Sequence, residues 1–213
     1  MNHLKPYHIR QLIFEGEDVS LDFKKTITSC SKIAKTLVAF ANNKGGRLLV
    51  GVADNGDIKG VRSEEEEKYM LTRAGNFYCR PAIEPSFEEV YIDDKIVLVA
   101  EINESDTKPH YALGDDNKWW VYIRVRDKSL LASKIVVDVL RGSSKEEGVF
   151  IEYSSKEKAL LEYLDSNERI TAREYGKMLN LSRRRAQRIL VNLVLSGVIR
   201  VHTTEKEEFY TAS

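Results

Sequence analysis

Apolar positions before residue 142 follow the periods of strands and helices in turn. In residues 29–41 the apolar side chains recur three and four positions apart, which predicts a helix. The continuous apolar run at residues 48–52 predicts a buried strand, and Ser63 followed by Glu66 predicts the start of another helix. Further strands are predicted at residues 19–27, 58–61, 87–91, 96–102 and 119–125, and a last helix at residues 133–140. This mixture predicts an α+β domain over residues 1–142.

The rest of the chain has a different pattern. Residues 143–155 mix small and charged side chains without periodicity, which predicts a linker. Three helices are predicted in residues 156–213, over 156–164, from Thr171 to Met178, and from Ser182 to Leu195, with Thr171 and Ser182 as N-caps. Alternation over 198–202 and 208–211 predicts a hairpin. Three helices and a hairpin resemble a winged helix-turn-helix domain, and that resemblance implies DNA binding.

The third of these helices is rich in arginine. Four arginines crowd its N-terminal end, and no acidic residue lies between Ser182 and Gly197. A recognition helix presents its N-terminal residues to the major groove, where Arg reads guanine or phosphate and Gln reads adenine. A solvated charged face and a protein-binding face are the alternatives. The residues predicted to contact double-stranded DNA are Thr171, Arg173, Ser182, Arg183, Arg184, Arg185, Gln187, Arg188 and Lys206.

Composition narrows the class of protein. The chain has 33 basic and 33 acidic residues. Residues 156–213 hold 11 of the basic and 8 of the acidic ones, a net +3, which leaves −3 for the remainder. Two distant cysteines, Cys30 and Cys79, argue against a disulfide scaffold or a zinc site. No apolar run reaches the roughly 18 residues of a membrane span, and residues 1–10 lack a secretion signal, so we expect a cytoplasmic protein.

Several motifs in the N-terminal part occur together. They are Glu17 with Asp22-Phe23-Lys24, the run FANNKGG at residues 40–46, GVADNG at residues 51–56, and Tyr122-Ile123-Arg124-Val125. Over about residues 12–140 the chain is similar to the Schlafen-AlbA-like domain of bacterial proteins. The resemblance implies a DNA-binding α+β domain that often precedes a winged helix. Members are described as transcriptional regulators and sometimes as ATP-binding proteins.

ATP binding is kept as the second alternative function. The chain has no phosphate-binding loop of the form G-x-x-x-x-G-K-[ST]. Gly45 and Gly46 precede a predicted strand, so they offer no helix N-terminus to a phosphate. A tight turn that lets the helix and the strand pack closely is the simpler interpretation of this pair.

The first alternative function is a metal-dependent RNA endonuclease. Animal Schlafen proteins that cut RNA use three carboxylates of this domain, and the resemblance carries these onto Glu17, Asp22 and Asp54, with Lys24 beside them. Such a cluster suits a divalent metal. Asp22 stands where the family has Glu, and this chain has one lobe where those nucleases have two, so a dimer is required. The simpler interpretations are an exposed ion pair of Asp22 with Lys24, and a turn at Asp54.

The leading hypothesis is therefore a DNA-binding transcriptional regulator that forms a homodimer, since paired half-sites raise affinity and specificity. It requires no catalytic residue and no cofactor, and a divalent metal enters only with the nuclease alternative. RNA remains a further candidate partner, and a membrane is not expected. Of Trp119 and Trp120, whose side chains alternate along a predicted strand, one is expected in the core.

Overall fold

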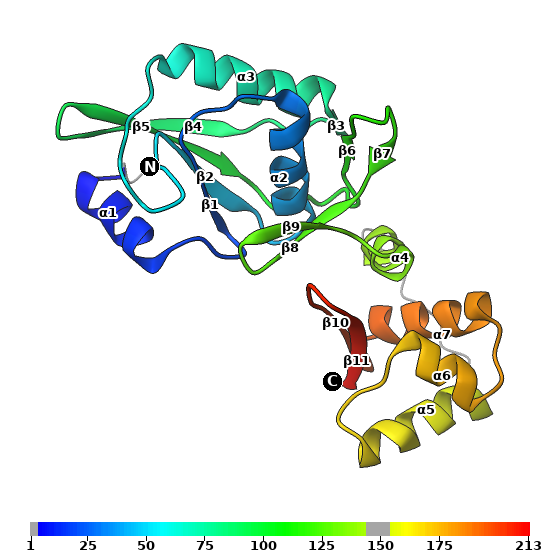
Figure 1. The fold of residues 1–213 in the computed structure, drawn as a ribbon. Helices are drawn as coiled ribbons and strands as arrows, with labels where there is room; N and C mark the ends of the chain where they lie inside the picture. Colours follow the sequence, from blue (N-terminus) through cyan, green and yellow to red (C-terminus); the bar gives the residue numbers. More distant parts are fainter. Residues whose placement is uncertain (1–3, 144–153) are drawn as a thin grey trace. The chain divides into compact units, whose positions relative to one another are not determined.

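The computed structural model describes residues 4–143 and 154–213. The chain divides into two compact units, Met1–Leu131 and Ala132–Ser213 (Figure 1). Within the described residues, no helix is long and apolar enough to cross a membrane.

The first unit is built on a four-stranded sheet with the strand order β1-β2-β5-β4. Strand β1 (Leu21–Lys24) runs parallel to β2 (Gly46–Val50), and helix α2 (Cys30–Asn42) connects them. Strand β2 pairs antiparallel with β5 (Lys95–Ile102), which in turn forms a hairpin with β4 (Ser86–Ile92). The hairpin turn is Asp93-Asp94, and both residues adopt positive φ.

Helices cover both faces of this sheet because its strands are apolar on both sides. Leu48 and Val50 of β2 belong to a core shared with α2 and with α3 (Glu64–Phe77). Leu49, between them, points to the opposite face and joins a second core that contains Ile9 of α1 (Pro6–Glu15). The sheet is thus the middle of three layers, with α2 and α3 on one face and α1 on the other (Figure 1).

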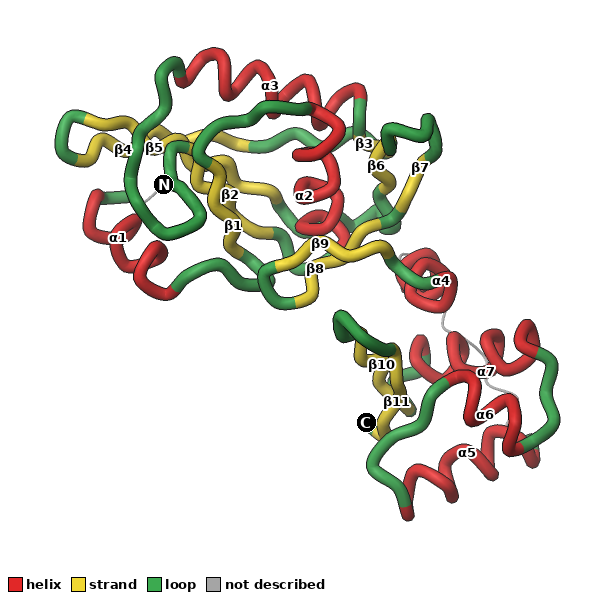
Figure 2. The backbone as a smooth tube through the Cα atoms, viewed as in Figure 1, coloured by secondary structure: helices red, strands yellow, loops and turns green. Residues whose placement is uncertain are grey.

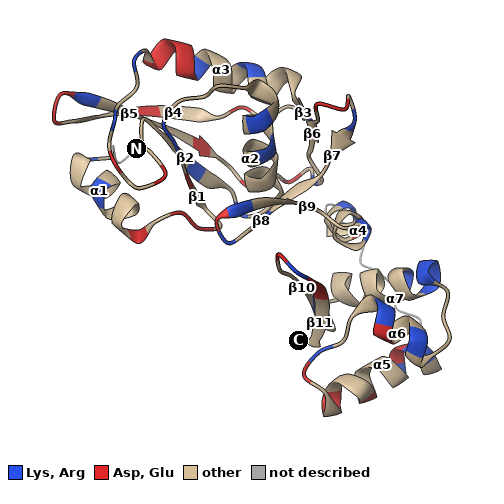
Figure 3. Cartoon of the chain, viewed as in Figure 1, with Lys and Arg blue, Asp and Glu red and all other residues tan. Residues whose placement is uncertain are grey.

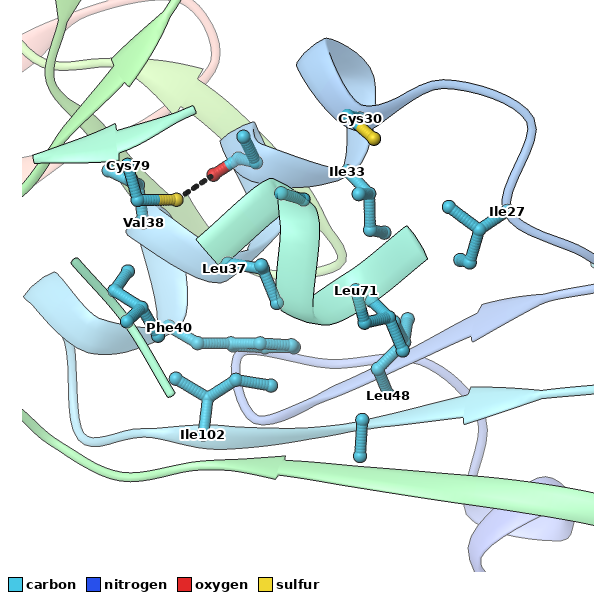
Figure 4. Close-up of a cluster of buried hydrophobic side chains, with 14 of the residues drawn as sticks. Ile27, Cys30, Ile33, Leu37, Val38, Phe40, Leu48, Leu71, Cys79 and Ile102 are labelled. Carbon is cyan, nitrogen blue, oxygen red and sulfur yellow. Dashed lines mark hydrogen bonds between the residues drawn. The ribbon is translucent and has the colours of Figure 1, made fainter. Parts of the chain in front are cut away.

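The core on the α2 side is tightly packed (Figure 4). A Cβ added to Gly46 would lie 2.4 Å from the Phe40 ring, and one added to Gly45 would lie 2.5 Å from the carbonyl oxygen of Ile102. Gly45 also has φ +78°. The two glycines therefore form the predicted tight turn, and Gly46 is the first residue of strand β2, so the turn leads into a strand and not into a helix.

Short strands complete the first unit (Figure 2). One small antiparallel sheet has the order β3-β6-β7, formed by β3 (Cys79–Arg80), β6 (Tyr111–Leu113) and β7 (Trp119–Trp120). A separate hairpin joins β8 (Tyr122–Val125) and β9 (Lys128–Leu131). Helix α2 packs against both β6 and β8.

The second unit has the helices and hairpin of a winged helix-turn-helix. Its elements are α4 (Lys134–Ser143), α5 (Ser155–Ser166), α6 (Ala172–Met178), α7 (Arg183–Leu195), β10 (Ile199–Thr203) and β11 (Glu208–Ala212). Strands β10 and β11 pair antiparallel over five residues each. One core holds the helices and the hairpin together, and Leu160, Tyr175, Leu190 and Tyr210 are fully buried in it.

The structure differs from the sequence-based expectations in several places, and strands β3, β6 and β9 were not predicted. Helix α4, expected to close the first domain, packs against α7 and belongs to the second unit. Helix α1 was not predicted. The strand expected at residues 58–61 is reduced to a single bridge between Ile58 and Val52. Residues 119–125 form two strands in two different sheets. The expected linker, residues 143–155, lies largely outside the described residues.

Candidate nucleic-acid interface

Helices α6 and α7 form the helix-turn-helix, and capping residues fix where each begins. The backbone N–H of Glu174 donates to Thr171 Oγ1 at 3.2 Å, and the Glu174 carboxylate accepts from the Thr171 backbone N–H at 2.8 Å. This reciprocal capping box starts α6. Ser182 starts α7 by accepting from the backbone N–H of Arg185 at 3.4 Å. The turn between them contains Asn180, which has φ +50°.

One face of α7 is buried, which decides what its other face presents. Ala186, Ile189, Leu190 and Leu193 recur at helical spacing and are at most 7% exposed. The arginines at positions 183, 184, 185 and 188 are all exposed. No acidic side chain among the described residues forms a salt bridge with any of these four guanidinium groups. Figure 3 shows basic residues on the first turns of α7 and on α6. The arginines therefore remain available to an anionic ligand.

The other predicted DNA-contacting residues lie in three different situations. Thr171 and Ser182 are the N-caps just described, so their hydroxyl groups already serve the fold. Arg173 is exposed on α6, and half-buried Gln187 lines a cavity together with Thr171, Arg173 and Arg183. Lys206 is exposed in the turn of the β10–β11 hairpin.

The carboxylates of the nuclease alternative are only partly brought together. Burial raises the pKa of Glu17, and the neighbouring Asp22 carboxylate adds to this effect, while a hydrogen bond from the Phe23 backbone N–H partly offsets it. Lys24 Nζ lies 2.8 Å from Asp22 Oδ2, but Asp22 is only 4% exposed, so the ion pair expected at the surface joins a buried acid to a lysine whose side chain is 37% exposed. Asp54 is exposed in a turn.

The described residues contain no group of three or more His, Cys, Asp or Glu side chains placed to hold a metal ion. Glu17, Asp22 and Asp54 therefore do not converge within this single chain.

Cys30 and Cys79 are both free and buried, and burial raises the pKa of the Cys79 thiol to about 12. Trp119 and Trp120 are both partly exposed, at 37% and 36%, so neither is the expected core residue.

Arg124 is a residue whose role the sequence did not reveal. Its Nη2 donates to the carbonyl oxygens of Asp18 at 2.7 Å and Leu21 at 3.2 Å, and its Nη1 lies 3.4 Å from Asp22 Oδ1. Its guanidinium group also lies 5.0 Å from the centre of the Phe40 ring. The Asp22 carboxylate is thus held by Arg124 on one side and Lys24 on the other. Nothing but its place in the Tyr122–Val125 motif marked Arg124 in the sequence.

The fold and the exposed arginine helix define a two-domain protein with a C-terminal DNA-binding domain. Residues 154–200 match the family model described as winged helix-turn-helix DNA-binding. Residues 17–133 match the model described as Schlafen, AlbA_2, and the chain belongs to that family.

Two solved structures are similar to parts of the chain. One is the N-terminal domain of a RecG-related protein from Nitrosomonas europaea, with 19% identity and a TM-score of 0.39 over 47% of this chain and 74% of that one. The other is the DIP2311 protein from Corynebacterium diphtheriae, with 16% identity and a TM-score of 0.45 over 70% of this chain and 30% of that one. Neither TM-score establishes a shared fold. Among curated proteins no significant match is found.

Proposed function

We propose that this protein is a bacterial transcriptional regulator that acts in the cytoplasm and reads duplex DNA through α7. The observation that carries the proposal is the position of the four exposed arginines on that helix. The positive end of a helix dipole lies at the N-terminus, where cations are unfavourable and anions are favoured. Arginines gathered there lower the stability of the free helix, so their placement is best explained by an anionic ligand.

Duplex DNA is the anion that suits this arrangement best. The planar guanidinium group binds guanine or phosphate through two parallel hydrogen bonds. Gln187 is the side chain on the same helix that suits adenine. The cap residues Thr171 and Ser182 contribute by fixing where α6 and α7 begin. Lys206 places a further positive charge in the turn of the β10–β11 hairpin. A homodimer would present two such helices to paired half-sites.

The test is binding of the purified full chain to a labelled duplex of random sequence, followed by fluorescence anisotropy at increasing salt. We expect binding at low salt that weakens linearly in log K against log salt, because each neutralised phosphate releases counterions. A variant with Arg183, Arg184, Arg185 and Arg188 all replaced by Gln should lose most of this binding and keep its circular dichroism spectrum. Wild-type protein that leaves the duplex unbound at low salt would refute the proposal. Light scattering that gives the mass of one chain at every concentration would refute the homodimer.

A further inference from the structure

The second unit has a cavity of about 670 Å³ lined by residues of α4, α6, α7 and β11. Thr171, Arg173, Arg183 and Gln187, which were predicted from the sequence to contact DNA, form part of its wall. The cavity therefore belongs to the surface that the proposed function assigns to DNA. Helix α4 is absent from the three-helix pattern of residues 156–213 and contributes Lys134 and Ile135 to the same cavity.

Two cations that the sequence analysis did not select also line this cavity. Lys134 is the first residue of α4, and Lys177 lies near the end of α6. Both side chains are exposed, and the described residues hold neither of them in a salt bridge. Hydrogen bonds from Thr171 are the main cause of the lowered pKa of Glu174, and the positive charge of Lys177 adds to this effect. Like the arginines of α7, Lys134 is a cation at a helix N-terminus, where carboxylates are the stabilising residues.

The cavity carries an excess of positive charge. Arg173, Arg183, Lys134 and Lys177 face a single acid among the described residues of its wall, Glu208. The two oxygens of Glu208 are already engaged, because they accept hydrogen bonds from Ser133 Oγ at 2.6 Å and from Tyr210 OH at 2.7 Å. The bond from Ser133 also ties the residue before α4 to the start of β11.

Packing fixes the position of Lys134 relative to α7. Ile135 is buried in the core of the second unit. At the other end of α4, a Cβ added to Gly142 would lie 2.4 Å from a methyl group of Leu195 in α7. Helix α4 is therefore held at both ends. The backbone of Lys134 is thus fixed in place before a ligand binds, and only its side chain has to be ordered on binding.

We propose that the sugar-phosphate backbone of duplex DNA passes over this cavity, and that Lys134 and Lys177 each neutralise one phosphate there. This inference rests on the proposed function and extends the interface to α4, outside the three-helix motif. Lysine suits the task because its ammonium group is a point charge that binds phosphate without reading a base. The two residues contribute affinity that does not depend on sequence.

The test uses Lys134→Gln, Lys177→Gln and the double variant in the full chain. Lys158→Gln is the matched control, because Lys158 is exposed on α5, pairs with Glu162 at 3.6 Å and does not line the cavity. Each single variant should weaken binding to duplexes of different sequences alike and reduce the slope of log K against log salt by about one. The double variant should reduce the slope by about two. The control should retain the wild-type slope.

The slope of log K against log salt is the decisive measurement because it counts the phosphates that the protein neutralises. A change in folding alone would not lower this slope by about one for each lysine replaced. If all three variants bind DNA with the wild-type slope, the inference about α4 is wrong while the proposed function stands. If wild-type protein does not bind DNA at low salt, both are wrong. If the loss of affinity is confined to one duplex sequence, these lysines contact bases, and the backbone proposal is overturned.

Discussion

The guanidinium group of Arg124 lies 3.4 Å from the carboxylate of Asp22, a residue 102 positions earlier in the chain. The two side chains are 1% and 6% exposed. Arg124 also donates to the carbonyl oxygens of Asp18 and Leu21, so one side chain ties the β8–β9 hairpin to the start of the main sheet. A charge buried in this way is tolerated only because it is paired and hydrogen-bonded.

Replacing Arg124 with Met should therefore be strongly destabilising. Among the described residues, the variant leaves Lys24 as the one cation paired with the buried Asp22 carboxylate and removes one hydrogen-bond donor from each of two carbonyl groups. Breaking a buried pair by removing one partner costs about 3–5 kcal/mol. The free energy of unfolding from urea denaturation measures the loss. Arg126→Met, at an exposed position in the same hairpin, should change it by less than about 0.5 kcal/mol. If Arg124→Met lowers the free energy of unfolding no more than Arg126→Met does, the Asp22–Arg124 pair contributes nothing to stability.

Replacing each of two helical glycines with alanine should change the stability of the protein in opposite directions. In α3, a Cβ at Gly75 would lie 2.0 Å from the carbonyl oxygen of Ile83, which is backbone and cannot move aside freely. Gly75→Ala should cost about 1–3 kcal/mol as an overpacked site. In α6, a Cβ at Gly176 meets nothing closer than 3.6 Å, so Gly176→Ala should gain up to about 1 kcal/mol of helix propensity. Thermal denaturation of both variants checks the signs, and a destabilised Gly176→Ala would contradict this account.

The parts of the fold that the sequence predicted well depend on local signals. Helix α7 was predicted because Ser182 caps it and because its apolar residues recur at helical spacing. The start of helix α6 was predicted in the same way, from Thr171 as its N-cap. Helix α1 carries comparable signals, Pro6 at its start and Gly16 with φ +83° after its end, and could have been found from them.

The predictions that failed concern features that are set by the path of the chain in space. The segment after Ile58 does not continue as a strand, because the backbone N–H groups of Lys59 and Gly60 both donate to the Gly51 carbonyl. The Asp22–Arg124 pair joins residues 102 positions apart, and such a pairing leaves no period in the sequence. Helix α4 could not be assigned to the second unit for the same reason, since its place follows from packing against α7.

His110 should make stability fall at mildly acidic pH. Its Nδ1 lies 2.9 Å from the Pro81 carbonyl oxygen and its Nε2 lies 2.7 Å from Ser105 Oγ. The carbonyl can only accept, so Nδ1 carries the proton and Nε2 accepts from Ser105 in the neutral ring. Burial lowers the pKa of His110, even though the hydrogen bond to Pro81 acts in the opposite direction.

The direction of this pH dependence follows from the number of protons that the folded and unfolded states bind. Below about pH 6.5 the unfolded chain protonates this histidine while the folded protein does not, so the free energy of unfolding decreases as the pH falls. The contribution is fully present above that pH and is lost progressively below it, down to the pKa of the folded state. Urea denaturation between these limits should show a smaller pH dependence for His110→Gln than for wild type. An identical pH dependence would mean that His110 is not the group that titrates.

Arg184 and Arg188 provide the most direct test of how α7 uses its arginines. If either reads a base, its replacement with Ala should cost about 1–3 kcal/mol of binding and relax the preference at one base pair. If it contacts phosphate, binding should weaken uniformly and the salt slope should flatten by about one. Lys158→Ala is the control for loss of a positive charge elsewhere in the second unit. Arg184→Ala should not lower the thermal midpoint, because removing a cation from the first turn of a helix relieves an unfavourable interaction with the dipole. Affinity and slope both equal to wild type would exclude these residues from the interface.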